Sequence, residues 1–133
     1  MSKLFEILSK IQTKPGMYIG RASVSDLFHF IVGFKTAFRE LGVEATAEEM
    51  DFYREFQPWV QKKYHVSTSN SWAKIIMLNC GTEQEGFNAF YRLLSEFQNR
   101  KKSLEGDKLG EIASEENRPS SIKDEKISPR RLG

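Results

Sequence analysis

The segment from Ser23 to Leu41, SVSDLFHFIVGFKTAFREL, constrains the fold of this chain more than any other feature. Apolar residues recur in it at steps of three and four, which places them along one side of a helix. They are Val24, Leu27, Ile31, Phe34, Phe38 and Leu41. Further apolar residues widen the stripe, namely Phe28, Phe30, Val32 and Ala37. A helix with so much apolar circumference needs neighbours on more than one side, so the pattern predicts the central helix of a bundle.

Helix-capping sequences mark the starts of further helices. A serine or threonine followed three residues later by an acidic residue opens a helix at Ser23, at Thr46 and at Thr82. Ser2 can cap a first helix, which should end before the Pro15-Gly16 turn. These signals, together with the spacing of apolar residues after each cap, predict several short helices and no sheet. The same spacing predicts the residues on two inner helix faces: Met50, Tyr53 and Phe56 after Thr46, and Phe87, Phe90, Leu94 and Phe97 after Thr82.

Three segments are harder to assign. Residues 17–20, which follow the Pro15-Gly16 turn, are expected to form an apolar loop folded onto the core. Pro58 cannot continue the helix that starts at Thr46 without losing a backbone hydrogen bond, so we expect a kink or a restart there. The run from Ile75 to Leu78 fits either a helix or a buried strand. A helix is favoured because no second strand-like run exists to pair with it.

The length of 133 residues allows one hydrophobic core and is too short for two ordinary ones. We expect residues 1–102 to form one all-α domain, a compact bundle of about five helices. Residues 103–133 contain no aromatic residue and are rich in Ser, Gly, Pro, Glu and Lys. Such a segment cannot bury enough apolar surface to offset its ordering entropy. A flexible, disordered C-terminal tail is therefore predicted.

The charge balance excludes some partners. With 20 basic and 18 acidic side chains, the net charge of +2 is too small to indicate binding to nucleic acid or to an anionic membrane. The single cysteine, Cys80, excludes an internal disulfide and a cysteine-based zinc site. Charged residues interrupt the first ten positions, which therefore lack the apolar core of a signal peptide. We expect a cytoplasmic protein.

The sequence contains no recognisable catalytic pattern. His29 and His65 have no acidic or histidine neighbour at a metal-ligand spacing, and Cys80 lies among apolar residues. Nucleophile-elbow, phosphate-binding and zinc-protease motifs are missing. We therefore expect neither an enzyme nor a cofactor.

Blocks of residues in a fixed order carry a family resemblance. The blocks are Pro15-Gly-Met-Tyr-Ile-Gly20, Leu27-x-x-Phe30-Ile31-x-Gly33-Phe34, Phe52-x-x-x-Phe56-x-x-Trp59-Val60-x-x-Lys63-Tyr64, Ser71-Trp72-x-x-Ile75-Ile76 and Glu85-Gly86-Phe87-x-x-Phe90-Tyr91-x-Leu93-Leu94-x-Glu96-Phe97. This order resembles small helical bacterial proteins that accompany polymorphic toxins, including immunity proteins of contact-dependent growth inhibition systems. The resemblance implies that the chain binds and neutralises the C-terminal domain of a cognate toxin, with a tRNA- or RNA-cleaving nuclease as the expected class.

A nuclease active site is basic, so an acidic surface would favour docking there. Glu48, Asp51 and Glu55 recur on one helix face, and Glu44 lies just before them. The exposed edges of Trp59 and Trp72 are further candidates, although tryptophan is more often a core residue. The acidic stripe can equally be an ordinary solvated helix face. The alternative functions are a helical adaptor or regulator with a non-toxin partner, and a nucleic-acid-binding bundle.

Overall fold

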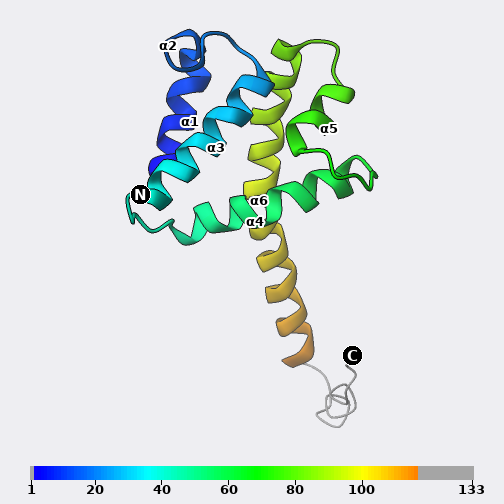
Figure 1. The fold of residues 1–133 in the computed structure, drawn as a ribbon. Coiled ribbons are helices and arrows are strands. Elements are labelled where there is room, and N and C mark those ends of the chain that lie inside the picture. The colour runs from blue at the N-terminus through cyan, green and yellow to red at the C-terminus, as the bar shows by residue number, and fades with distance from the viewer. Residues whose placement is uncertain (1, 117–133) are drawn as a thin grey trace. The chain divides into compact units, whose positions relative to one another are not determined.

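The computed structural model describes the backbone of residues 2–116 and the side chains of residues 2–100. Over the described backbone the chain forms six helices and no strand (Figure 1). They are α1 (Lys3–Thr13), α2 (Pro15–Ile19), α3 (Val24–Glu40), α4 (Ala47–Lys63), α5 (Trp72–Leu78) and α6 (Glu83–Glu116). The predicted all-α fold is confirmed, and so is the choice of helix over strand for Ile75–Leu78. Residues 1–97 make one compact unit, which contains the first part of α6.

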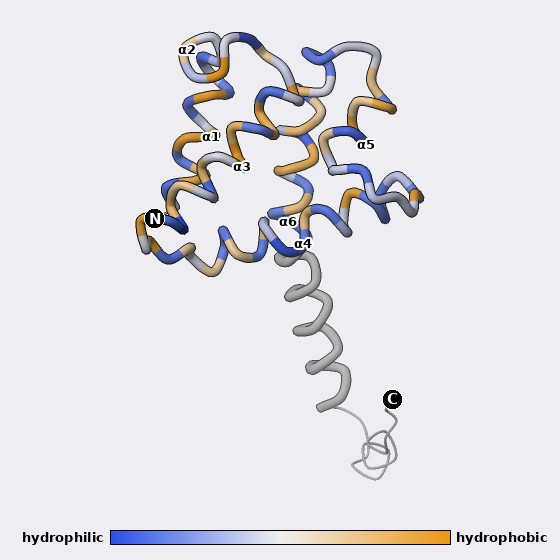
Figure 2. Tube along the Cα trace, viewed as in Figure 1, coloured by the Kyte–Doolittle hydropathy of each residue, from blue (hydrophilic) through white to orange (hydrophobic). Residues whose placement is uncertain are grey.

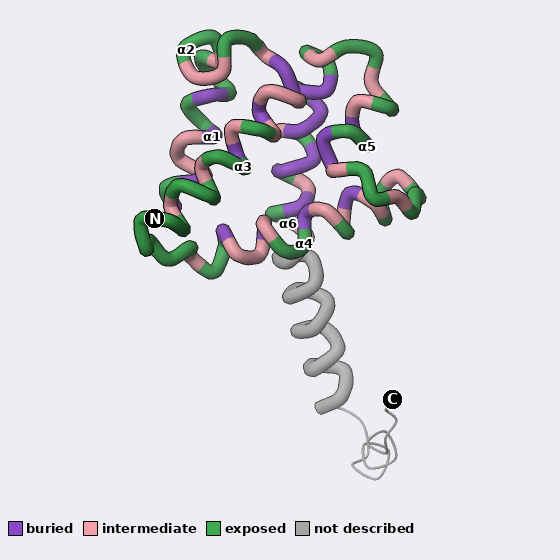
Figure 3. Tube along the Cα trace, in the orientation of Figure 1, coloured by how far each residue is buried: buried purple, intermediate pink, exposed green. Residues whose placement is uncertain are grey.

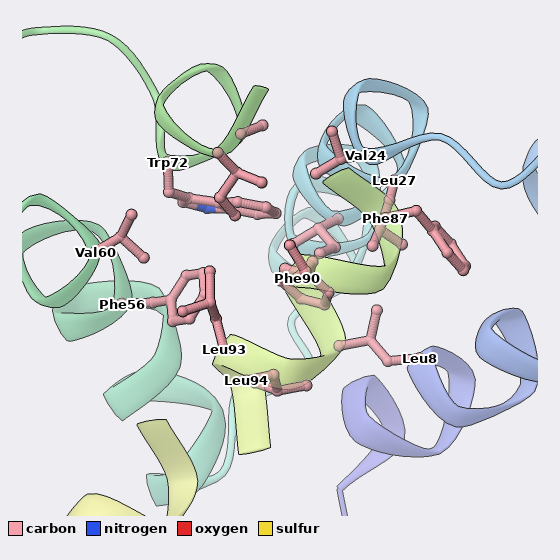
Figure 4. Close-up of a cluster of buried hydrophobic side chains, with 14 of the residues drawn as sticks. Leu8, Val24, Leu27, Phe56, Val60, Trp72, Phe87, Phe90, Leu93 and Leu94 are labelled. Atoms are coloured by element: carbon pink, nitrogen blue, oxygen red, sulfur yellow. The ribbon is translucent and has the colours of Figure 1, made fainter. Parts of the chain in front are cut away.

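The first part of α6, not α3, is the central helix of this unit. Its buried residues face several neighbours, and they are Phe87, Ala89, Phe90, Leu93, Leu94 and Phe97. Figure 4 shows Phe90 in the middle of the cluster, with side chains of α1, α3, α4 and α5 around it. In α3 the buried residues all precede Val32, and the second half of the helix is half-buried or exposed (Figure 3). The prediction that α3 is central was therefore wrong.

Aromatic side chains hold α4, α5 and α6 together. The ring of Trp72 stacks on that of Phe90 with 4.9 Å between their centroids. Phe56 meets Phe97 and Phe90 edge to face, at centroid distances of 5.3 and 5.7 Å. Such pairs stabilise by roughly 0.5–1.5 kcal/mol beyond their buried area. The strongest packing therefore lies on the α6 side of α4, around Phe56 and Phe52 rather than around the predicted Tyr53.

One buried glutamate of α4 caps two helices. Glu49 belongs to the predicted capping box, in which it accepts a hydrogen bond from the Thr46 N–H at 2.9 Å. Its other carboxylate oxygen accepts from the Ser2 hydroxyl at 2.7 Å and from the Leu4 N–H at 3.0 Å, at the start of α1. Burial acts to raise the pKa of Glu49, but the hydrogen bonds from Ser2, Leu4 and Thr46 outweigh it and lower the pKa. The glutamate therefore joins the starts of α1 and α4 in its charged form.

Glu83, the first residue of α6, likewise binds the start of another helix, α3. One carboxylate oxygen accepts from the Ser23 hydroxyl at 3.0 Å and the Ser25 N–H at 2.9 Å, and the other accepts from the Ser25 hydroxyl at 2.7 Å. Burial acts to raise its pKa, and these hydrogen bonds together lower it. Both carboxylates also compensate the positive end of a helix dipole.

Two local predictions need correction. Residues 17–20 were expected to form a loop, but α2 is a short helix, because a proline at the first helical position is pre-organised for it. The expected packing of this segment on the core is confirmed for Tyr18 and Ile19, whereas Met17 is 70% exposed. Of the kink or restart expected at Pro58, the restart is wrong, because α4 runs through Pro58 as one helix, and the kink stays a prediction. Pro58 and Arg54 are both exposed, so water can hydrogen-bond the carbonyl that the proline leaves without an N–H partner.

The last helix extends past the predicted domain boundary at residue 102. The helix α6 continues to Glu116, over a stretch in which Glu, a good helix former, is the commonest residue. The first part of the predicted tail, residues 103–116, is therefore helical. The remainder of that tail, residues 117–133, lies outside the described residues.

Candidate functional site

An apolar cleft of about 400 Å³ lies between the second half of α3, the connection to α4 and the first half of α4. Figure 2 shows apolar residues on α3 and on this connection. The side chains that form its apolar walls are Phe34, Phe38, Val43, Met50 and Tyr53. Its volume falls within the range of about 300–1,000 Å³ that is usual for ligand pockets. The cleft is therefore large enough to take a few apolar side chains of a partner.

The α3 wall of the cleft consists of two stacked phenylalanine rings. Phe34 and Phe38 lie one helical turn apart, with 4.2 Å between ring centroids and 21° between ring planes. Both rings are half-buried, whereas the sequence predicted them in the core. Met50 and Tyr53 on α4 were likewise expected to face inward and instead line the cleft. Four residues that were assigned to the core thus form an open apolar surface.

The end of α3 places Val43 at the edge of the cleft. Gly42 adopts a φ of 74°, which favours glycine, and its N–H donates to the carbonyl of Arg39 at 3.0 Å. The Val43 N–H donates to the carbonyl of Phe38 at 2.9 Å. These two bonds form a Schellman motif, which brings the residue after the glycine against the last turn of the helix. The motif holds Val43 beside Phe38 while leaving Val43 48% exposed.

Cationic groups lie on the α3 rim of the cleft. The Nζ atom of Lys35 lies 4.9 Å from the centroid of the Tyr53 ring, and Arg39 follows one turn later. Among the described side chains, neither cation has a carboxylate within 4.0 Å. Burial, and then the negative charge of Glu49, raise the pKa of Tyr53 to about 12, so its hydroxyl stays protonated at neutral pH. The α3 rim therefore carries two positive charges, and no carboxylate of the described side chains forms an ion pair with either of them.

One of the four predicted acidic residues lines the cleft, and the other three do not. Glu44 is exposed and lines the cleft from the connection between α3 and α4. Glu48 and Glu55 are exposed and Asp51 is half-buried, and none of the three lines the cleft. At about 100° per residue, their positions lie on a different face of α4 from the residues that do. The acidic stripe and the cleft thus lie on opposite faces of α4.

The two predicted tryptophans differ. Trp72 is only 7% exposed, and its ring is packed against Phe90, so it offers a partner almost no surface and is removed from the candidate set. Trp59 is half-buried, and its ring meets Phe97 edge to face at 5.5 Å between centroids. The Nζ atom of Lys63 lies 5.7 Å from the Trp59 ring centroid. Trp59 therefore keeps its exposed edge as a candidate contact.

Sequence reasoning missed the cleft, although a signal for it was present. The apolar stripe of α3 is wider than a helix with one neighbour requires. We interpreted the excess as evidence for extra neighbours within the domain. The structure instead leaves the second half of that stripe accessible, next to the exposed Leu41 and Val43. An apolar surplus on one helix can therefore indicate a binding surface as well as a core.

The walls of the cleft are mainly apolar side chains. No three His, Cys, Asp or Glu side chains of the described part lie close enough to hold a metal ion. No helix in the described part is long and apolar enough to cross a membrane. Comparisons of the chain with protein-family models, with curated proteins and with solved structures found no match.

Proposed function

We propose that the protein is an immunity protein, which binds the C-terminal domain of a cognate toxin and neutralises it by stoichiometric contact. The observation that carries this proposal is the accessible apolar cleft between α3 and α4, bordered by Leu41, which is 75% exposed, and by Val43. Clustered exposed apolar residues on a small domain mark surfaces that bind other molecules. The family resemblance described above supplies the class of partner.

Neutralising a toxin requires tight binding. A dissociation constant near nanomolar corresponds to about −12 kcal/mol. Such complexes usually bury roughly 1,600 Å² in total, with a few anchoring side chains supplying most of the energy. The cleft supports this requirement because its walls of Phe34, Phe38 and Tyr53 can enclose an apolar anchor of the partner. The rest of the interface would extend over α4.

The acidic stripe on α4 supports a basic partner such as a nuclease. Glu48 and Glu55 are exposed and lie on the face of α4 opposite the residues that line the cleft. Acidic groups at an interface accelerate encounter with a basic surface and orient it. A toxin domain that is anchored in the cleft and also extends around α4 to the stripe would bring its basic active site towards these residues, and inhibition would follow from occlusion of that site.

Co-expression with a candidate toxin domain, encoded beside this chain, tests the proposal. The variant Val43→Glu places a charge in the cleft, and Val32→Glu is a matched control. Val32 lies on α3 and does not line the cleft. Its exposed fraction of 46% is close to the 48% of Val43. We expect the wild-type chain and Val32→Glu to protect cells, and Val43→Glu to lose protection while keeping its helical circular dichroism spectrum.

Two results would count against the proposal. The toxin could kill cells despite wild-type protein, or Val43→Glu could protect as well as Val32→Glu. A complex with an unrelated protein that needs an intact cleft, combined with no protection, would instead support the adaptor function.

A further inference from the structure

We infer that the partner segment that enters the cleft carries a carboxylate beside its apolar anchor, and that Lys35 and Arg39 bind this carboxylate. The inference deepens the proposed function and rests on it, because it concerns the same cleft. It predicts an acidic group of the partner at the cleft, whereas the part of the partner that faces the acidic stripe of α4 is expected to be basic.

The placement of the two cations carries the argument. Lys35 and Arg39 are four residues apart on α3 and each directly follows a phenylalanine of the cleft wall, Phe34 or Phe38. Both cations therefore border the apolar surface that an anchor would cover. Among the described side chains they have no carboxylate within ion-pair distance, and the contact of Lys35 is with the face of the Tyr53 ring.

The acidic groups of the cleft do not form ion pairs with these cations. The carboxylate of Glu49 is occupied by hydrogen bonds from Ser2, Leu4 and Thr46. Glu44 is exposed on the connection between the helices, and its carboxylate is not within ion-pair distance of either cation. The formal charges that line the cleft cancel, but the two cations lie together on the α3 rim, where no carboxylate of the described residues forms an ion pair with them.

Covering the cleft makes the charge of the partner decisive. A partner that buries a cation without an anion loses the solvation of that charge and gains nothing in return. A carboxylate placed over Lys35 and Arg39 forms charge-assisted hydrogen bonds, and the arginine can bind it with two parallel N–H donors. A basic anchor would meet like charges. The favoured occupant is therefore a short amphipathic helix of the partner, whose apolar side chains enter the cleft and whose Asp or Glu lies one turn away.

Selection from a displayed library of helical peptides tests this chemistry without knowledge of the partner. The library is selected on the full-length chain, on Val43→Glu and on the double variant Lys35→Glu/Arg39→Glu. We expect peptides enriched on the wild-type chain to combine two or more apolar residues with Asp or Glu. They should bind the double variant at least about tenfold more weakly, and exchange of their acidic residues for Lys should reverse that preference.

A milder variant, Lys35→Gln/Arg39→Gln, keeps the test valid if charge reversal unfolds the protein, and thermal melting identifies that case. The inference is overturned if nothing is enriched relative to Val43→Glu, if the enriched peptides are basic, or if they bind both double variants as tightly as wild type. Protection assays separate the two proposals. If both double variants still protect cells, the inference is refuted and the proposed function stands. If acidic peptides are selected but the wild-type chain does not protect cells, the proposed function is refuted and the inference stands.

Discussion

Replacement of Glu49 by Gln should destabilise the protein far more than its conservative chemistry suggests. The carboxylate of Glu49 accepts three hydrogen bonds, from Ser2, Leu4 and Thr46, with one oxygen shared by Ser2 and Leu4. A glutamine has one acceptor oxygen and one NH₂ group. If its oxygen faces Ser2 and Leu4, its NH₂ group is directed at the Thr46 N–H, which is itself a donor.

The magnitude follows from these bonds. Hydrogen bonds to a charged group contribute roughly 1.5–3 kcal/mol each and neutral ones about 0.5–1.5 kcal/mol. The substitution removes one charged bond and turns two others into neutral ones, so the expected loss is about 3.5–6 kcal/mol of unfolding free energy. The neighbouring Glu48 is exposed and lies in the same first turn of α4. Glu48→Gln therefore provides a matched control, with an expected loss of about 0.5 kcal/mol.

Urea denaturation of wild type, Glu49→Gln and Glu48→Gln at pH 7 and at pH 3 measures the effect. The pKa of Glu49 is lowered from the ordinary value of 4.5, so its charged form stabilises the fold fully above pH 4.5 and loses that contribution as the pH falls through the lowered pKa. The difference between wild type and Glu49→Gln should accordingly shrink in acid. A loss no larger than that of Glu48→Gln, or one that stays undiminished far below the lowered pKa, would refute the reasoning.

Three further substitutions test the packing, each by urea denaturation. His65 has a φ of 56° in the turn that ends α4, so His65→Gly should stabilise by up to about 1 kcal/mol, and a net loss would contradict the strain. A Cβ atom at Gly86 would lie 2.6 Å from Cγ1 of the buried Val24, so Gly86→Ala should cost about 1–3 kcal/mol; a neutral result would mean that α3 and α6 separate easily. Phe90→Ala should cost about 3–5 kcal/mol, and a cost below 1 kcal/mol would remove α6 from the centre of the fold.

The starts of the helices could be predicted from the sequence because capping is local. Ser2, Ser23 and Thr46 each accept a hydrogen bond from the N–H three residues later, as their positions before the apolar runs indicate. The inner residues Phe87, Phe90, Leu94 and Phe97 of the last helix were also found from their spacing alone. Signals contained within one helical turn were therefore sufficient for the fold class.

The centre of the core and the candidate site could not be predicted in this way. Both depend on which helix covers which face, and periodicity does not identify the neighbour. Phe34 and Phe38 have the same spacing as Ile31, yet only Ile31 is buried. Glu49 was identified as part of a capping box, but its partners Ser2 and Leu4 lie more than forty residues away in the sequence, at separations of 47 and 45. Contacts at that range depend on the assembled structure.

The two glutamates that cap earlier helices have a consequence for synthesis on the ribosome. Residues Ser2 and Glu49 are separated by 47 positions, and Ser23 and Glu83 by 60. The carboxylates that accept hydrogen bonds from the first N–H groups of α1 and α3 are therefore translated much later than those helices. A nascent chain that ends before Glu83 has only one of the two carboxylates in place, and we expect it to remain exposed to proteases until the start of α6 has left the exit tunnel.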